Sequence, residues 1–170
     1  MADTTNFDFL NEHDPVFVQL AAAAERSFIS DPNTTMIKLR QLGEAIAQDL
    51  AARCNIRFDE RTTQLELLQQ IRHEIRLEPN VLELFHLLRV EGNKATHQFK
   101  THHKEAITGM RAARELAVWY QRAFGKQGAA FKPAPFVAPK DPSIELRELQ
   151  IHIAQLKSQS QMLLNINYTL

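Results

Sequence analysis

The stretch that decides the fold is residues 31–54, which read DPNTTMIKLRQLGEAIAQDLAARC. It opens with Asp31-Pro32, a carboxylate suited to capping a helix and a proline at the first helical position. Apolar or small residues then recur three and four positions apart, as on one face of a helix: Met36, Leu39, Leu42, Gly43, Ile46 and Leu50. The sequence therefore predicts a long helix that begins after Asp31 and ends near Cys54.

Similar start signals occur on both sides of this stretch. Upstream, Asp14-Pro15 predicts a helix over about residues 15–29. Downstream, Thr63 with Glu66 matches a capping box, and Glu78-Pro79 begins a fourth helix whose apolar pattern is interrupted at Gly92-Asn93. A fifth helix opens at Thr101 and ends before Gly125, where a terminal glycine belongs. The expected fold class is all-α, with about five helices in one bundle over residues 1–125 and no sheet.

A proline-rich segment follows the bundle at residues 126–142. It holds four of the seven prolines of the chain, and proline cannot continue a helix, so this segment is expected to be an extended connector. Phe131 and Phe136 lie within it. Because exposed aromatic side chains are unfavourable in a free linker, we expect both to pin this arm onto the helical body.

Residues 143–170 return to a helical pattern. Apolar residues alternate three and four positions apart, broken once by serine, in a seam of nearly three heptads: Leu146, Leu149, Ile153, Leu156, Ser160 and Leu163. An isolated helix of this length is marginal in water, so the seam requires a partner. The partner is the helical body, a second copy of the chain in a dimer, or a downstream domain of the same polypeptide to which this helix begins the connector.

Composition excludes several classes of protein. The chain carries 20 Lys and Arg against 20 Asp and Glu, so a nucleic-acid contact would have to be a local patch. The single cysteine, Cys54, precludes an internal disulfide and fits a reducing compartment, so we expect a cytoplasmic protein. Residues 1–14 carry no secretory signal, and no apolar run is long enough to span a membrane.

The chain contains no recognisable catalytic motif. Neither Gly92-Asn93-Lys94 nor Gly125-Lys126 has the glycine loop and following hydroxyl residue that cradle a nucleotide phosphate. The sequence shows neither a nuclease carboxylate set nor a zinc pattern. We therefore expect no catalytic residue, no metal and no cofactor in this chain.

The short span from Arg89 to His97 offers two interpretations. Arg89, Asn93 and His97 could hold a phosphate, with arginine binding it and histidine acting as acid or base. The favoured interpretation is structural: Gly92 lets the backbone turn, Asn93 caps that turn, and His97 bonds to Asn93 or to backbone at the junction of two helices.

A local basic cluster overlaps and follows this span, and Arg111 and Arg114 lie on the next helix. The members that could contact phosphates of DNA or RNA are Lys94, Lys100, His102, His103, Lys104, Arg111 and Arg114. The alternative is an ordinary solvated loop and helix start, and the sequence favours this second interpretation.

Several segments together resemble the start of the R subunit of type I restriction enzymes. They are residues 6–10, 13–17, 31–35, 38–44, 88–97, 113–120 and 131–137. In that family a helical module precedes a nuclease and an ATP-driven DNA translocase. The resemblance implies a non-catalytic N-terminal accessory domain that serves assembly or DNA engagement. ATP and Mg²⁺ are then expected only in the downstream domains of a type I site-specific deoxyribonuclease, and methyltransferase subunits and DNA are the implied partners.

The module is also similar to HEPN-type helical domains, some of which cleave RNA with an Arg-Asn-x-x-x-His motif. Asn93 and His97 match the last two motif positions, whereas Gly92 stands in place of the arginine. Arg89 is the nearest upstream arginine, and without a cation at position 92 nothing obvious stabilises the charge that develops on the phosphate. RNA binding or cleavage is therefore the alternative function, and a plain dimerisation module is a third.

Overall fold

The computed structural model describes residues 5–167, and within that range every regular element is helical. Six α-helices and two short 3-10 helices follow one another with no strand between them in the described range. The predicted all-α fold is therefore confirmed. Residues 1–4 and 168–170, including the end of the predicted heptad tail, lie outside the described residues.

The first two long helices begin where their capping residues predict. Helix α1 spans Pro15–Ser27, and the Asp14 carboxylate accepts a hydrogen bond from the Val16 amide at 2.8 Å. Helix α2 spans Pro32–Arg53, and Asp31 accepts from the Thr34 amide at 3.0 Å. Both carboxylates satisfy amides that a helix start leaves unpaired. A 3-10 helix, η1 at Asp8–Glu12, precedes them.

Helix α3 spans Gln64–Glu74 and carries the predicted capping box. The Glu66 amide donates to the Thr63 hydroxyl at 3.2 Å, and the Thr63 amide donates to the Glu66 carboxylate at 2.8 Å. The Thr63 amide and the Thr63 hydroxyl both donate to the Glu66 carboxylate and lower the pKa of Glu66, since the ionised carboxylate is the better acceptor. Residues 54–63 separate it from α2.

Helix α4 corrects one prediction. It spans Pro79–Gln98 without a break, so Gly92 and Asn93 lie inside the helix and form no turn. The chain turns instead at Phe99, whose φ of 54° is left-handed. Gly92 serves close packing: a Cβ on it would lie 2.4 Å from the Cβ of Arg40 on α2. The cost of glycine in a helix is outweighed here by the close approach of two helices.

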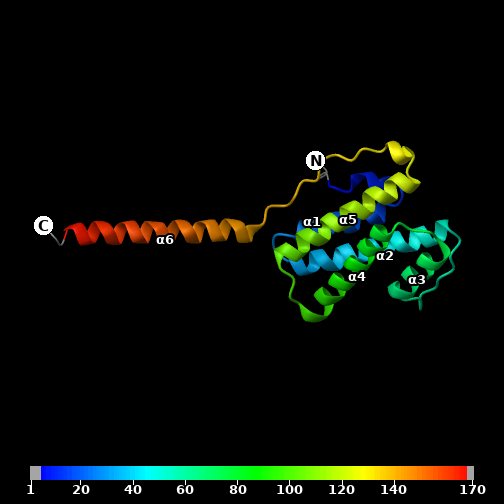
Figure 1. Cartoon of the computed structure of the whole chain (residues 1–170), viewed down its shortest axis with the longest axis horizontal. Helices are drawn as coiled ribbons and strands as arrows, with labels where there is room; N and C mark the ends of the chain where they lie inside the picture. The colour runs from blue at the N-terminus through cyan, green and yellow to red at the C-terminus, as the bar shows by residue number, and fades with distance from the viewer. Residues whose placement is uncertain (1–4, 168–170) are drawn as a thin grey trace. The chain divides into compact units, whose positions relative to one another are not determined.

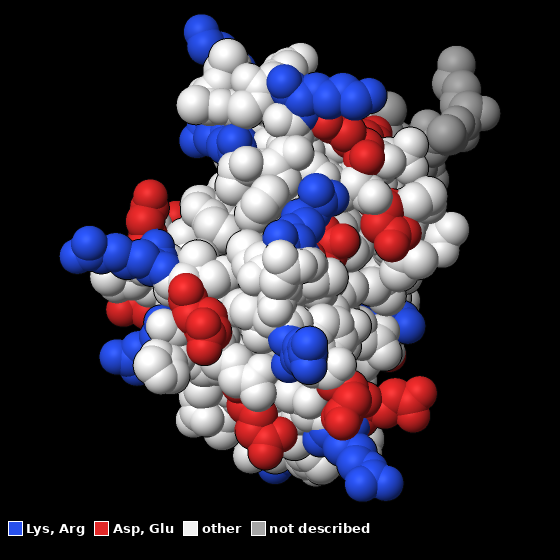
Figure 2. All heavy atoms as spheres, turned by 90° about the vertical axis from the view of Figure 1, so that its right-hand side faces the viewer, with Lys and Arg blue, Asp and Glu red and all other residues white. Residues whose placement is uncertain are grey.

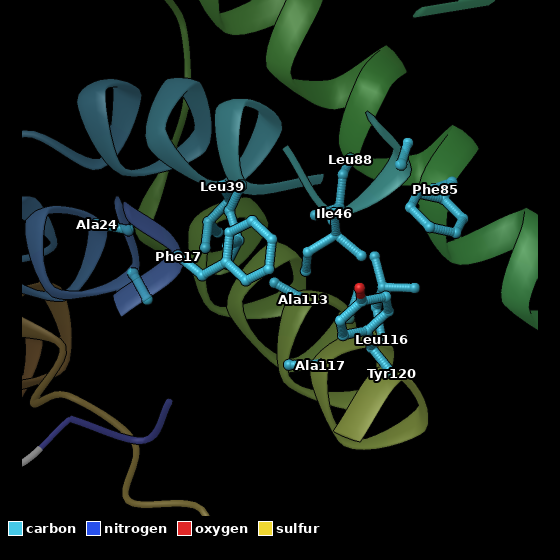
Figure 3. Packing of buried hydrophobic residues seen from close by; sticks show 14 of the residues in the cluster. Phe17, Ala24, Leu39, Ile46, Phe85, Leu88, Ala113, Leu116, Ala117 and Tyr120 are labelled. Carbon is cyan, nitrogen blue, oxygen red and sulfur yellow. The ribbon is translucent and has the colours of Figure 1, made fainter. Parts of the chain in front are cut away.

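Helix α5 spans His103–Phe124 and completes the bundle. It begins two residues after the predicted start at Thr101, and Gly125 follows it directly. Helix α2 contacts α1, α3, α4 and α5, so it lies at the centre of the bundle (Figure 1). Figure 3 shows the core that these helices share, with Phe17, Leu39 and Ala113 meeting on one side and Phe85, Leu88 and Ile46 on the other.

The chain divides into two compact units, Met1–Pro139 and Lys140–Leu170. The first ends with the 3-10 helix η2 at Gly128–Ala130 and an extended arm over residues 131–139. The second contains α6, Pro142–Asn167. The apolar seam of α6 is exposed along its length, with Leu149 57% and Leu156 61% accessible.

Candidate functional site

The predicted motif lies in the C-terminal half of α4, with Arg89, Asn93 and His97 at four-residue spacing on one helix face. Asn93 is half-buried and its side-chain oxygen accepts a hydrogen bond from Nη1 of Arg40 at 2.8 Å. His97 is exposed. Asn93 therefore fixes α4 to α2, which corrects the prediction that it caps a turn at the junction of α4 and α5.

Arg40 is the residue that sequence analysis missed at this place. Its stem lies against Gly92, because the Cβ, Cγ and Cδ of Arg40 all come within 3 Å of where a Cβ at position 92 would stand. Its guanidinium also pairs with Glu44 at 3.4 Å, one turn further along α2. A guanidinium thus stands beside Asn93 although residue 92 is glycine. No pattern along α4 could reveal it, since Arg40 and Asn93 are 53 positions apart.

The junction between α4 and α5 is fixed by residues other than the predicted pair. The Asn33 side chain donates to the carbonyl of Ala95 at 2.9 Å, and its oxygen accepts from the Thr101 hydroxyl at 2.9 Å. His103 forms a hydrogen bond with the carbonyl of Ile29 at 3.1 Å, and its ring meets Phe28 edge to face. These contacts tie the turn to the start of α2 and the end of α1.

The structure gathers some members of the predicted basic cluster and separates others. Lys100, His102 and Lys104 are exposed close together in sequence, around the turn and the start of α5. Lys94 is paired with Glu91 at 2.7 Å. Figure 2 shows a different face, the end of the bundle at α3, where positive and negative side chains are interspersed.

The two arginines of α5 lie against the arm. Arg111 places its guanidinium 5.0 Å from the centre of the Phe136 ring, a cation–π geometry. Arg114 is 8% exposed, donates from Nη2 to the carbonyl of Ala134 at 2.6 Å, and stands over the ring of Phe9. Burial lowers the pKa of Arg114. Among the described residues, its Nε and Nη1 have no hydrogen-bond partner.

A second set of contacts holds the arm to the N-terminal segment. Asn6 pairs with the backbone of Val137 in both directions, donating at 2.9 Å and accepting at 2.8 Å. Asn6 also donates from its side chain to Glu25 at 2.6 Å. Phe131 packs on Phe9 with ring centres 5.0 Å apart. Between segment and arm lies a mostly apolar groove of about 680 Å³ with Arg114 and Glu25 in its lining. Burial raises the pKa of Glu25.

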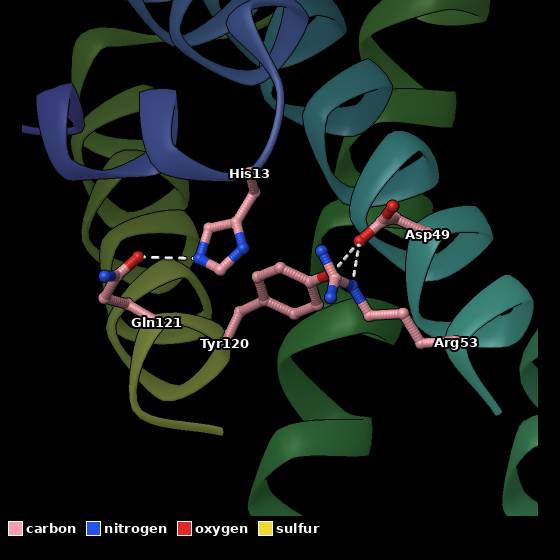
Figure 4. Close-up of polar contacts among 5 residues, drawn as sticks. All are labelled: His13, Asp49, Arg53, Tyr120 and Gln121. Atoms are coloured by element: carbon pink, nitrogen blue, oxygen red, sulfur yellow. Dashed lines mark hydrogen bonds and ion pairs between the residues drawn. The ribbon is translucent and has the colours of Figure 1, made fainter. Parts of the chain in front are cut away.

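A polar network lies at the end of the bundle where α2 and α5 terminate (Figure 4). The buried hydroxyl of Tyr120 donates to the carboxylate of Asp49, and Arg53 donates to the same carboxylate at 2.7 Å. His13 meets the Tyr120 ring edge to face and forms a 2.7 Å hydrogen bond with the side-chain oxygen of Gln121.

This network extends to the N-terminal segment through Glu12. The Gln121 amide donates to the Glu12 carboxylate at 2.8 Å, and the backbone amide of Lys126 donates to its other oxygen. These two bonds, the first above all, lower the pKa of Glu12. The network therefore closes the bundle end and has the features of a structural clasp.

The described residues contain neither a metal-binding cluster nor a membrane-spanning helix. In residues 5–167 no group of three or more His, Cys, Asp or Glu side chains is placed to hold a metal ion. No helix in the described part of the chain is long and apolar enough to cross a membrane.

Comparison with known proteins identifies the family to which the chain belongs. The model of the family described as "Domain of unknown function (DUF4145)" matches residues 22–121. The chain is 36% identical over 140 residues to the "Type I restriction enzyme EcoKI endonuclease subunit" of Escherichia coli (strain K12). That match covers 82% of this chain and 12% of the relative, and no solved structure matches. The predicted similarity to the type I restriction subunit is confirmed. The chain belongs to the DUF4145 domain family.

Proposed function

We propose that this chain is a non-catalytic accessory module of a type I restriction endonuclease polypeptide. It serves assembly of a DNA-cleaving, ATP-dependent complex and engagement of its DNA. The observation that carries the proposal is the 36% identity to the EcoKI endonuclease subunit, sustained over 82% of this chain. Because the chain spans 12% of that relative, the proposal assigns cleavage and ATP-driven steps to the rest of the parent polypeptide.

The geometry supports an accessory role because three of the predicted site residues are used in packing. Asn93 is bound to Arg40, His103 is bound to the end of α1, and Arg114 lies beneath the arm. General acid–base chemistry needs a titratable side chain within hydrogen-bond reach of the reacting substrate atom. These three side chains instead join three different pairs of segments.

The arm gives this module a fixed attachment point. Three side chains hold residues 134–137 against the bundle. Asn6 and Arg114 bond to the backbone of this segment, and Arg111 contacts the ring of Phe136. The chain beyond Pro139 therefore leaves the bundle from a defined place. A defined exit suits a module that must present its surface to partner subunits while it remains tethered to downstream domains.

The test uses the purified chain with two partners from its own organism: the methyltransferase assembly and the downstream portion of the restriction polypeptide. Light scattering after size-exclusion chromatography should show a stable complex with one of them. The variant Arg111→Ala, which loosens the arm, should weaken that complex. Absence of any complex, or Mg²⁺-dependent plasmid nicking that is lost on substituting a residue of this chain, would overturn the proposal.

RNA binding or cleavage is a second candidate, favoured by the position of Arg40. Its guanidinium beside Asn93 supplies a cation near Gly92, the position at which the motif has arginine. Cleavage of single-stranded RNA by the pure chain, lost in both Arg40→Gln and His97→Ala, would establish it. Intact RNA after prolonged incubation with wild type would exclude cleavage.

A further inference from the structure

The turn between α4 and α5 presents an aromatic side chain to solvent. Phe99 is 78% exposed, the highest value among the large apolar residues that the structure describes. Its φ of 54° lies in the left-handed region, which is sterically unfavourable for a residue with a Cβ. Glycine ends helices in this conformation without strain. Phe99 thus carries two unfavourable features together, exposure of a ring and a strained backbone, and neither contributes to the core.

The turn around Phe99 is held firmly in place. Thr101 donates to Asn33, and His103 is bonded to the carbonyl of Ile29, so the connection between α1 and α2 fixes it. A ring on such a turn loses little conformational freedom on binding a flat partner.

The side chains next to the ring are cationic or titratable. Lys100 and Lys104 are exposed, as are His97 and His102. The nearest acid in sequence, Glu105, accepts a hydrogen bond from the backbone amide of His102 at 3.2 Å and is used as a helix cap. The surface therefore combines one exposed ring with lysines on its C-terminal side. Proteins that bind single-stranded nucleic acids use aromatic rings to stack on the bases and cationic side chains to pair with the phosphates.

We propose that residues 97–104 form a contact surface for single-stranded DNA, on which one base stacks against Phe99 while Lys100 and Lys104 pair with the flanking phosphates. A duplex keeps its bases stacked on one another and offers the ring no free face. The proposal rests on the proposed function only in its choice of DNA over RNA.

The experiment measures binding of a fluorescent oligothymidylate of about 12 nucleotides to the full chain by anisotropy. The variant Phe99→Gly should weaken binding about tenfold, the loss expected for one stacked base. Because glycine accepts the left-handed backbone, this variant should melt no lower than wild type. The pair Lys100→Gln and Lys104→Gln should weaken binding and make it less sensitive to salt. Val137→Ala and Lys132→Gln, exposed positions on the arm, serve as matched controls and should bind as wild type does.

Each remaining outcome decides a different point. Equal binding by wild type and Phe99→Gly would overturn the surface and leave the proposed accessory function standing. Equal competition by a duplex of the same length would overturn the stacking contact. Tighter binding of oligouridylate RNA would overturn the assignment of this surface to DNA and would favour the RNA-binding alternative.

Discussion

Arg40 and Asn93 join the two most extensively packed helices of the bundle, with Nη1 of Arg40 donating to Oδ1 of Asn93 at 2.8 Å. The bond lies beside Gly92, where the two helices approach so closely that a methyl group has no room. Asn93, the motif residue that suggests catalysis in the sequence, therefore serves a contact between α2 and α4.

This relationship predicts different outcomes for Asn93 and His97, the last two motif positions on α4. Asn93→Ala leaves a partly buried guanidinium with one partner fewer and should lower the free energy of unfolding by about 1–2 kcal/mol. His97→Ala removes an exposed side chain and should change it by less than about 0.5 kcal/mol. Urea denaturation of both variants measures the difference, and a larger loss for His97→Ala would contradict the structural assignment.

Gly92→Ala should destabilise the bundle by about 1–3 kcal/mol through overpacking of α2 against α4. The matched control is Gly43→Ala on the facing helix, whose added Cβ would meet the flexible end of Leu88 at 3.2 Å. The control should lose less, because a leucine methyl can move and the Cβ of Arg40 cannot. Thermal melts that place both variants at the same temperature would show that α4 has no close approach at Gly92.

Tyr120→Phe should lower the free energy of unfolding by about 1–2 kcal/mol, because it removes a donor to the Asp49 carboxylate inside the bundle end. Asp49→Asn keeps an oxygen acceptor for the hydroxyl and should cost less. Denaturant titrations of the two variants provide the comparison. A stability of Tyr120→Phe equal to that of wild type would mean that the clasp in Figure 4 contributes nothing to the fold.

Glu25 should make the protein less stable as the pH rises through the acid range. Burial raises its pKa above the unfolded value of 4.5, so the folded state holds the proton more tightly. This contribution is fully present below the unfolded pKa and is lost as the pH rises through the folded pKa. Glu25→Gln should therefore flatten this part of the profile measured from about pH 4 to about pH 7. Parallel profiles for wild type and variant would show that Glu25 titrates normally.

The exposed seam of α6 should make the isolated chain self-associate. The seam follows the pattern of a parallel two-stranded coiled coil, with leucine at positions 149, 156 and 163 and isoleucine at position 153. Sedimentation should show a dimer for residues 1–170 and a monomer for residues 1–139, with the same melting temperature for the compact first unit. Equal oligomeric states for both chains would exclude α6 as the dimer contact.

Local chemistry determined most of the helix boundaries. Asp14, Asp31 and the pair Thr63 and Glu66 each cap a helix with atoms that lie within three residues, so the sequence alone locates the starts of α1, α2 and α3. The apolar spacing along each helix identifies its buried face for the same reason, because the period of the helix is fixed.

Only the tertiary structure decided the course of α4 and the surroundings of its motif. A glycine followed by asparagine favours a turn locally, and the helix continues through them because α2 packs against the surface that Gly92 leaves open. Arg40 stands 53 residues from Asn93, and Ala134 stands 20 residues from Arg114. Contacts over such distances depend on how helices pack, and packing is a property of the whole core that no local pattern contains.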